Sequence, residues 1–190
     1  MNFYMQMREE KLENTPVLYM RRTGPYGPEN AALMETFKAW IKTHGLDDGE
    51  TVIVAVPLDD PRVTKAEECR YDVCLVHETG RQENWDGVET RTLDGGRSVT
   101  FLLEHTQEAV QRAWSECFAA LEGQGYAPDV SRPVMERYAK KMVDAHLYGD
   151  NVFEKCGINR DEAGEIGKTR YFSGKRQHLR RERPAVYQQS

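Results

Sequence analysis

Two stretches of the chain repeat their apolar residues at the 3.6-residue period of an α-helix, and these stretches constrain the fold most strongly. The first spans about residues 29–44 and ends at Gly45, a residue suited to the left-handed conformation that follows many helices. The second follows Thr106, a plausible N-cap, and ends at Gly123. The apolar stripes are Leu33, Phe37, Trp40, Ile41 and His44 in the first helix, and Val110, Ala113, Trp114, Cys117, Phe118 and Leu121 in the second. Each helix therefore has one face that another layer of structure must cover.

Segments rich in apolar or β-branched residues flank both helices and predict strands. They are residues 3–9, 17–22, 51–58, 69–76, 87–93, 97–104 and 133–139, with a less regular last candidate at 152–158. Asp94-Gly95-Gly96 is typical of a hairpin turn. The order strand, strand, helix, strand, strand thus occurs twice. It predicts an α+β fold of two pseudo-symmetric strand-helix-strand-strand units with antiparallel sheets, and a central cleft between them as the natural pocket.

The 190-residue chain has a formal net charge of −5, and this charge is unevenly placed. Residues 168–190 are strongly basic, so the part before them is acidic. An acidic body binds nucleic acid poorly and attracts cationic ligands. Residues 159–190 contain few large apolar groups, and we expect them to form a flexible, basic tail.

Composition and spacing also argue against several classes of protein. The longest apolar run, Val52–Val56, is too short to cross a bilayer, and residues 1–10 lack the pattern of a signal peptide. We therefore expect a cytoplasmic protein without a membrane partner. The four cysteines and five histidines show no metal-ligand spacing, and there is no phosphate-binding loop. No metal or cofactor is expected, and the cysteines are expected to be reduced structural thiols.

Three short motifs follow one another in the first part of the chain. They are Thr23-Gly24-Pro25-Tyr26-Gly27, Asp59-Asp60-Pro61 and Cys69-Arg70-Tyr71-Asp72-Val73-Cys74. In this order, with the helix at 29–44, they resemble the GyrI-like small-molecule-binding domain of gyrase-inhibitory proteins and AraC-type regulators. The resemblance covers about residues 2–147. It implies a ligand-binding domain over 1–158, with halves of about 1–80 and 81–158.

Glu136 is the main candidate for a functional side chain. It lies on a predicted strand whose alternation places Val134, Glu136 and Tyr138 on one face. From composition alone, the simpler interpretation is a solvated carboxylate beside Arg132 and Arg137. The resemblance implies instead that Glu136 lies on the floor of a cavity and meets cationic or polar ligands. A carboxylate that is partly desolvated there would have a raised pKa.

Six aromatic side chains are further candidates for ligand contact. They are Tyr19, Tyr26, Tyr71, Phe101, Trp114 and Tyr138. Flat rings hold planar or cationic ligands by stacking and cation–π contact, worth on the order of 0.5–2 kcal/mol each. Tyr26 could form a rim of the cavity or only a structural turn, and Trp114 could equally belong to the core. Arg70 and Asp72 share a face of one predicted strand and are interpreted as a structural pair.

Three functions stay open at this stage. The first is a stand-alone protein that binds hydrophobic or cationic small molecules, since the domain begins almost at Met1 with no helix-turn-helix before it; the family implies sequestration, sensing or protection against toxins. The second is a hydrolase, because some relatives open the strained cyclopropane of DNA-alkylating compounds; Glu136 would then be catalytic. The third is a protein inhibitor of DNA gyrase, which rests on the resemblance alone.

Overall fold

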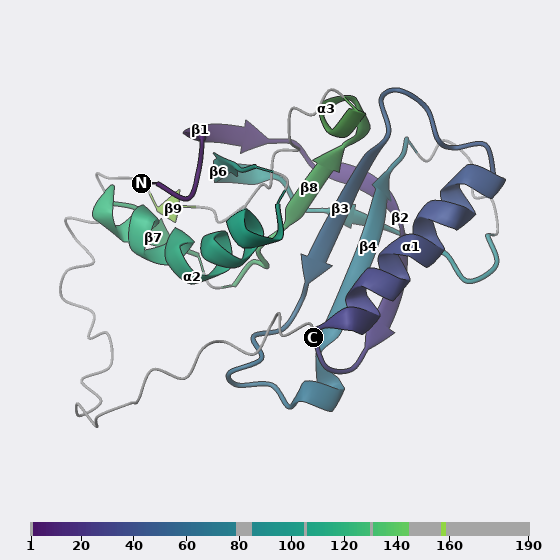
Figure 1. The fold of residues 1–190 in the computed structure, drawn as a ribbon, viewed down its shortest axis with the longest axis horizontal. Helices are drawn as coiled ribbons and strands as arrows, with labels where there is room; N and C mark the ends of the chain where they lie inside the picture. The colour runs from purple at the N-terminus through teal and green to yellow at the C-terminus, as the bar shows by residue number, and fades with distance from the viewer. Residues whose placement is uncertain (1, 79–84, 105, 130, 145–156, 159–190) are drawn as a thin grey trace.

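The computed structural model describes residues 2–78, 85–104, 106–129, 131–144 and 157–158 (Figure 1). The strands are β1 (Gln6–Leu12), β2 (Thr15–Thr23), β3 (Val52–Pro57), β4 (Arg70–Val76), β5 (Glu89–Leu93), β6 (Gly96–Leu102), β7 (Ala127–Pro128), β8 (Glu136–Ala139) and β9 (Gly157–Ile158). The helices are α1 (Pro28–Thr43), α2 (Gln107–Gly123), the short α3 (Lys140–Asp144) and a 3₁₀ turn, η1 (Ala66–Glu68). No helix in these ranges has the length and hydropathy needed to cross a bilayer.

The strands form antiparallel sheets, and the predicted α+β class is confirmed. The central sheet has the order β5-β2-β4-β3-β8, while β1 pairs with β6 and β7 pairs with β9. Figure 1 shows α1 lying across one face of the central sheet. The predicted order of elements recurs, but the pseudo-symmetry of two units is not confirmed, because β5, β6, β7 and β8 are divided among three sheets.

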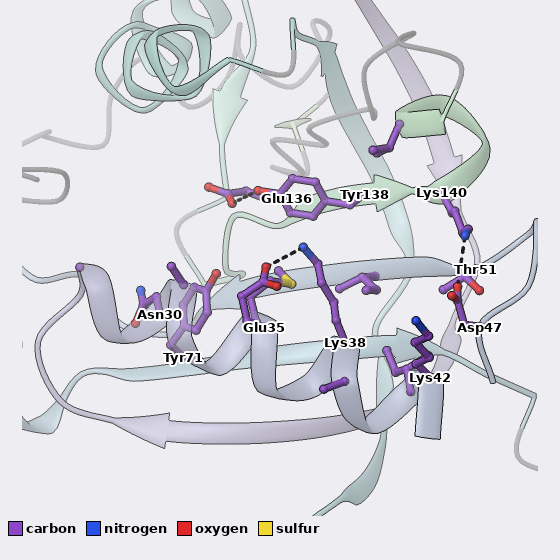
Figure 2. A pocket seen from close by; sticks show the side chains of 17 residues that line it. Asn30, Glu35, Lys38, Lys42, Asp47, Thr51, Tyr71, Glu136, Tyr138 and Lys140 are labelled. Carbon is purple, nitrogen blue, oxygen red and sulfur yellow. Dashed lines mark hydrogen bonds and ion pairs between the residues drawn. The ribbon is translucent and has the colours of Figure 1, made fainter. Parts of the chain in front are cut away.

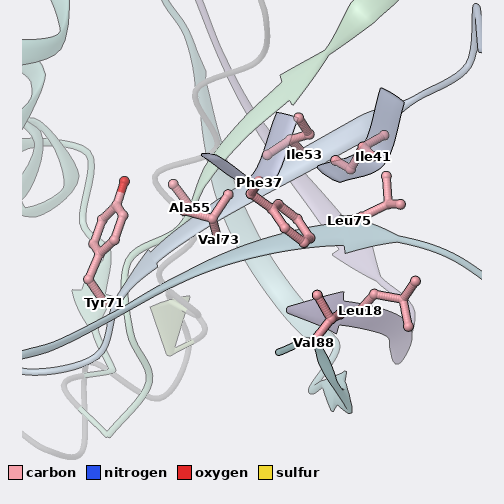
Figure 3. Close-up of a cluster of buried hydrophobic side chains, with 9 residues drawn as sticks. All are labelled: Leu18, Phe37, Ile41, Ile53, Ala55, Tyr71, Val73, Leu75 and Val88. Carbon is pink, nitrogen blue, oxygen red and sulfur yellow. The ribbon is translucent and has the colours of Figure 1, made fainter. Parts of the chain in front are cut away.

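Helix α1 begins and ends as its sequence predicts. Pro28 occupies its first turn, where a missing N–H costs nothing, and Gly45 follows the helix with φ 67°. The helix buries Phe37 and Ile41 against the central sheet. Figure 3 shows these two side chains among sheet residues that alternate toward the helix, namely Leu18, Ile53, Ala55, Tyr71, Val73 and Leu75. This cluster is the first core of the protein.

A second core lies beneath helix α2. The side chain of Thr106 accepts a hydrogen bond from the Ala109 amide at 3.2 Å, so the predicted N-cap is confirmed. The helix buries Ala113, Cys117 and Leu121. These residues pack in one cluster with Phe3, Val99, Phe101, Leu103 and Val134. Each of these two cores is covered by one of the two predicted helices. A third buried cluster contains Val17, Tyr19, Val54, Val56, Cys74 and Leu93.

The first strand lies three residues later than predicted. Residues 3–9 alternate in polarity, but Phe3 is buried in the core under α2 and does not belong to a strand. The observed strand is Gln6–Leu12, which pairs with β6 along its whole length. Glu9 forms an ion pair there with Arg97, which lies two positions along β6 from Val99, the register partner of Glu9. Charged residues in the second half of this strand explain why apolar alternation gave its bounds too early.

The predicted hairpin at Asp94-Gly95-Gly96 is wrong. Strand β5 pairs with β2 and strand β6 pairs with β1, so the two strands diverge into different sheets. The turn lies instead against the connection between β1 and β2, where the Gly95 amide donates to Asn14 Oδ1 at 2.8 Å. Glycine is required because a Cβ at position 95 would meet the backbone of Leu12, Glu13 and Asn14, at 2.7 Å from the Asn14 nitrogen.

The tight approach at Gly95 gives a stability prediction. We expect Gly95→Ala to lower the free energy of unfolding by about 1–3 kcal/mol, since backbone atoms must move to make room for the methyl group. Gly49→Ala is the matched control, because a Cβ at position 49 would meet no atom within 4 Å. Urea denaturation measures both. Equal stability of the two variants would contradict the close contact at residue 95.

Arg70 and Asp72 do not pair with each other, contrary to the sequence interpretation. Arg70 forms an ion pair with Asp59 at 2.8 Å at the end of β3. Asp72 has no exposed surface and pairs with Arg21 of β2 at 2.6 Å and with Arg91 of β5 at 2.9 Å. Both partners come from other strands, and the sequence spacing within β4 carries no information about them.

Two predictions concern residues near the end of the chain. Of the candidate strand 152–158, Gly157–Ile158 form β9, and residues 152–156 lie outside the described residues. The basic tail at 159–190 also lies outside them.

Cys69, Cys74 and Cys117 are buried free thiols, as expected for structural cysteines, while Cys156 is outside the described part of the chain. Burial raises the pKa of Cys74 to about 12, which makes this thiol unreactive at neutral pH.

Candidate functional site

A cavity of about 600 Å³ lies between helix α1 and the edge of the central sheet formed by β8 (Figure 2). Its walls come from α1, from Thr51 and Ile53 at the start of β3, from Tyr71 of β4 and from Glu136 and Tyr138 of β8. Strand β8 is placed there by its pairing with β3, in which Glu136 lies opposite Ala55 and Tyr138 opposite Ile53. The cavity therefore joins an element of the predicted first half to one of the predicted second half.

Glu136 is the buried polar group of this cavity. Its residue is only 3% exposed. The indole nitrogen of Trp114 donates to Oε1 at 2.6 Å, and the Tyr138 hydroxyl lies 2.7 Å from Oε2. No basic side chain in the described ranges forms an ion pair with Glu136. The carboxyl group is thus held in place by two neutral groups, and its charge has no protein counter-ion among the described residues.

Burial controls the ionisation of this carboxyl group. Loss of hydration raises the pKa of Glu136, and the hydrogen bonds from Tyr138 and Trp114 lower it by a smaller amount. A carboxylate in this state favours any cation that can replace the missing water. The solvated alternative, with Glu136 beside Arg132 and Arg137, does not describe this side chain; Arg137 instead approaches Glu10 at 3.6 Å.

Three of the aromatic candidates gather near Glu136. Tyr71 and Tyr138 line the cavity, and Tyr71 is nearly buried. Trp114 does not line it, but its indole group fixes the Glu136 carboxylate from the side of α2. The arrangement places aromatic side chains beside a buried carboxyl group that has no basic partner among the described residues, a combination that suits a hydrophobic cation.

Two aromatic candidates lie elsewhere. Phe101 is fully buried in the core under α2, with its ring centroid 5.2 Å from those of Phe3 and Tyr4. Tyr19 projects from the other face of the central sheet, where it donates to Glu89 at 2.5 Å and lies beneath the guanidinium of Arg91. Neither ring lines the cavity, since both are held by contacts inside the fold.

Tyr26 supports the cavity and does not line it. Its hydroxyl donates to the carbonyl oxygen of Arg70 at 2.9 Å and is also bonded to the backbone of Asp59. Burial raises the pKa of Tyr26 to about 12. Its ring meets Tyr71 edge-on, with the centroids 6.2 Å apart. The structure therefore favours the structural interpretation of this turn, with Tyr26 positioning Tyr71.

The charged lining of the cavity could not be identified from the sequence. Beside Glu136, the lining includes Glu35, Lys38, Lys42, Asp47 and Lys140. Residues 31, 34, 35, 38 and 42 form a second helical stripe on α1, next to the core stripe at 33, 37, 40 and 41. The helical spacing of these residues can be read from the sequence, but a polar stripe on a helix normally faces solvent. This stripe lines a cavity only because β8 lies opposite α1. No cluster of three or more metal-ligating side chains occurs among the described residues.

Comparison with known sequences places the chain in a family. The family model for the GyrI-like small molecule binding domain matches residues 5–148. The SPbeta prophage-derived candidate transcriptional regulator YosT of Bacillus subtilis (strain 168) is 37% identical over 147 residues, which cover 75% of this chain and 95% of YosT. A DNA gyrase inhibitor of Edwardsiella piscicida is 30% identical over 138 residues, which cover 70% of this chain and 86% of that protein.

Solved structures share the fold at low sequence identity. The C-terminal domain of EcmrR has a TM-score of 0.52 at 14% identity, and covers 70% of this chain and 83% of its own. SAV2435 bound to tetraphenylphosphonium has a TM-score of 0.50 at 13% identity, and the match covers 83% of this chain and 97% of SAV2435. A hydrolase encoded by lin2189 from Listeria innocua has a TM-score of 0.50 at 9% identity, and the match covers 82% of this chain and 93% of the hydrolase. With the sequence match over most of its length, the chain belongs to the family of GyrI-like small-molecule-binding domains.

Proposed function

We propose that this protein binds hydrophobic organic cations in the cavity between α1 and β8, with Glu136 as the counter-ion. The observation that carries the proposal is the buried Glu136 carboxylate, which is hydrogen-bonded by Trp114 and Tyr138 and has no basic partner among the described residues. A neighbouring fold, SAV2435, is bound to tetraphenylphosphonium, a ligand of this chemical class.

The physical argument depends on the burial of Glu136, which is only 3% exposed. A strongly hydrated cation such as an ammonium ion would lose most of its hydration on entering, whereas a large organic cation is weakly hydrated and loses little. At 4 Å and an effective dielectric constant of 20, two opposite charges attract by about 4 kcal/mol. The rings of Tyr71 and Tyr138 add dispersion and cation–π contact. The cavity should therefore select for charge and apolar surface together.

The biological use of such binding is also part of the proposal. Sequestration, ligand sensing and protection against toxins all need the same site, and YosT carries the name of a regulator. The cytoplasmic location and the stand-alone role both stay predictions.

A protein–protein contact with DNA gyrase is a separate possibility, supported by relatives that are named gyrase inhibitors. Inhibition of supercoiling by the purified protein in the absence of any ligand would support it.

Hydrolysis is the second candidate function. A carboxylate with a raised pKa beside aromatic walls could orient or deprotonate water, and one neighbouring fold is named a hydrolase. Incubation with a cyclopropane-containing alkylating compound separates the two functions. Stoichiometric capture without product supports binding, whereas repeated turnover that is lost in Glu136→Gln supports hydrolysis.

A pair of ions of the same shape tests the binding proposal. We expect tetraphenylphosphonium to bind in the micromolar range by isothermal titration calorimetry, and tetraphenylborate, which carries the opposite charge, to bind at least about tenfold more weakly. The comparison removes size and apolar area as explanations. Equal affinity for the two ions, or no binding of tetraphenylphosphonium, would contradict the proposal.

A further inference from the structure

The charges that line the cavity form pairs, except for two. Lys38 pairs with Glu35 at 3.0 Å, and Lys140 pairs with Asp47 at 3.6 Å. The remaining charged groups of the lining are Lys42, an exposed side chain in the last turn of α1, and the buried Glu136. Lys42 forms no ion pair or hydrogen bond through its side chain within the described part of the chain. Among the described residues, Lys42 and Glu136 are thus the two charged lining groups that have no oppositely charged partner.

These two groups lie toward different ends of the cavity. Figure 2 shows Tyr71 and Asn30 at one end, with Glu136 above them, and Lys42, Asp47 and Lys140 at the other. The Lys140 amide donates to the Thr51 carbonyl at 2.9 Å, which fixes that second end. Glu136 and Lys140 lie four positions apart at the two ends of β8, roughly 13 Å along an extended chain. A ligand that meets both groups must therefore carry two opposite charges, one for each end of the cavity.

We propose that the preferred ligands are zwitterions, in which an aromatic cation carries an acidic group that reaches Lys42. This inference rests on the proposed function and adds a second contact to it. A simple cation would neutralise Glu136 and leave Lys42 as a weakly repulsive charge. A carboxylate on the same molecule would pair with Lys42 at the open end, where both groups keep some of their water and the gain is modest. The cavity then recognises the separation of two charges, and not only the presence of one.

Rhodamine B and its ethyl ester test this inference, because they share the same aromatic cation and differ in whether the carboxyl group is free or capped by an ethyl group. We expect the wild-type protein to bind rhodamine B about three- to tenfold more tightly than the ester by calorimetry. Lys42→Gln should remove this preference by weakening rhodamine B while the ester binds as well or slightly better. Lys65→Gln, an exposed lysine paired with Glu68 away from the cavity, makes the same change in net charge and should leave the preference unchanged.

The possible outcomes distinguish the preference for zwitterions from the proposed binding of cations. If Lys42→Gln weakens both dyes equally, or the wild-type protein favours the ester, the inference is wrong while cation binding stands. If neither dye binds, or Glu136→Gln leaves the affinity for both dyes unchanged, both proposals are wrong. Thermal unfolding of each variant checks that Lys42→Gln and Lys65→Gln are folded, and both are exposed positions where substitution is tolerated.

Discussion

Asp72→Ala should lower the free energy of unfolding by about 3 kcal/mol. Asp72 has no exposed surface, and it accepts hydrogen bonds from Arg21 Nε at 2.6 Å and from a second nitrogen of Arg21 at 2.9 Å. It also pairs with Arg91 at 2.9 Å, so one carboxylate connects β4 with β2 and β5. Removing one partner of a buried ion pair costs about 3–5 kcal/mol. The lower value applies because the side chains of Arg21 and Arg91 stay 35% and 23% exposed.

An exposed ion pair provides the control for Asp72. Arg112 and Glu116 pair at 3.0 Å on the surface of α2, and Glu116→Ala should change the stability by about 0.5 kcal/mol or less. Urea denaturation of both variants at neutral pH measures the contrast. A loss below about 1 kcal/mol for Asp72→Ala would show that the two arginines do not depend on this carboxylate.

Glu136→Gln should weaken the binding of tetraphenylphosphonium at least about tenfold and stabilise the unliganded protein at neutral pH. Glutamine has nearly the same shape, its oxygen can accept from Trp114, and the Tyr138 hydroxyl can rotate to accept from the amide nitrogen. The substitution therefore removes the charge and keeps the hydrogen bonds. Glu116→Gln makes the same change of net charge on the surface of α2 and should affect neither property.

The ionisation of Glu136 determines how the stability of the protein and its affinity for the cation change with pH. Because burial raises its pKa above the ordinary 4.5, the folded state holds the proton more tightly than the unfolded state. The ionised group costs stability above the folded-state pKa, and this cost disappears as the pH falls through that pKa toward 4.5. The affinity for the cation should fall as the pH drops below the folded-state pKa, since the protonated group carries no charge.

Measurements at pH 7.5 and pH 5 test this coupling. The variant should exceed the wild type in stability at pH 7.5, by about 1.4 kcal/mol for each unit by which the pKa is raised, and this advantage should shrink at pH 5. Its cation affinity should be independent of pH. A variant that is less stable than the wild type at pH 7.5 would show that Glu136 is not an unpaired buried charge.

The helices and the central strands could be predicted from the sequence, because their signals are local. Pro28, Gly45 and Thr106 act through the backbone of their own helix ends. The apolar run of β3 is buried along Ile53–Val56, so it reads as a continuous hydrophobic segment, and residues 69–76 were predicted as a strand from their alternation. The first strand was predicted three residues too early, at 3–9, because much of β1, which pairs with β6, is charged or polar.

The site was only partly predictable because it depends on which strands become neighbours. Glu136 and Tyr138 were found from alternation within one strand and from the family resemblance. The lysines of α1 became candidates only once β8 was seen to pair with β3 and face that helix. Asp72 was paired with Arg70 on local spacing, whereas its partners Arg21 and Arg91 come from β2 and β5. Pairings across a sheet are set by register, which a single sequence does not specify.

A crystal structure of the complex with tetraphenylphosphonium tests the central claim most directly. The account predicts that the cation occupies the cavity between α1 and β8, with phenyl rings against Tyr71 and Tyr138. Its phosphorus atom should lie nearer to the Glu136 carboxylate than to any other acidic group. A cation bound outside this cavity, or a Glu136 side chain turned away from the ligand into water, would contradict the account.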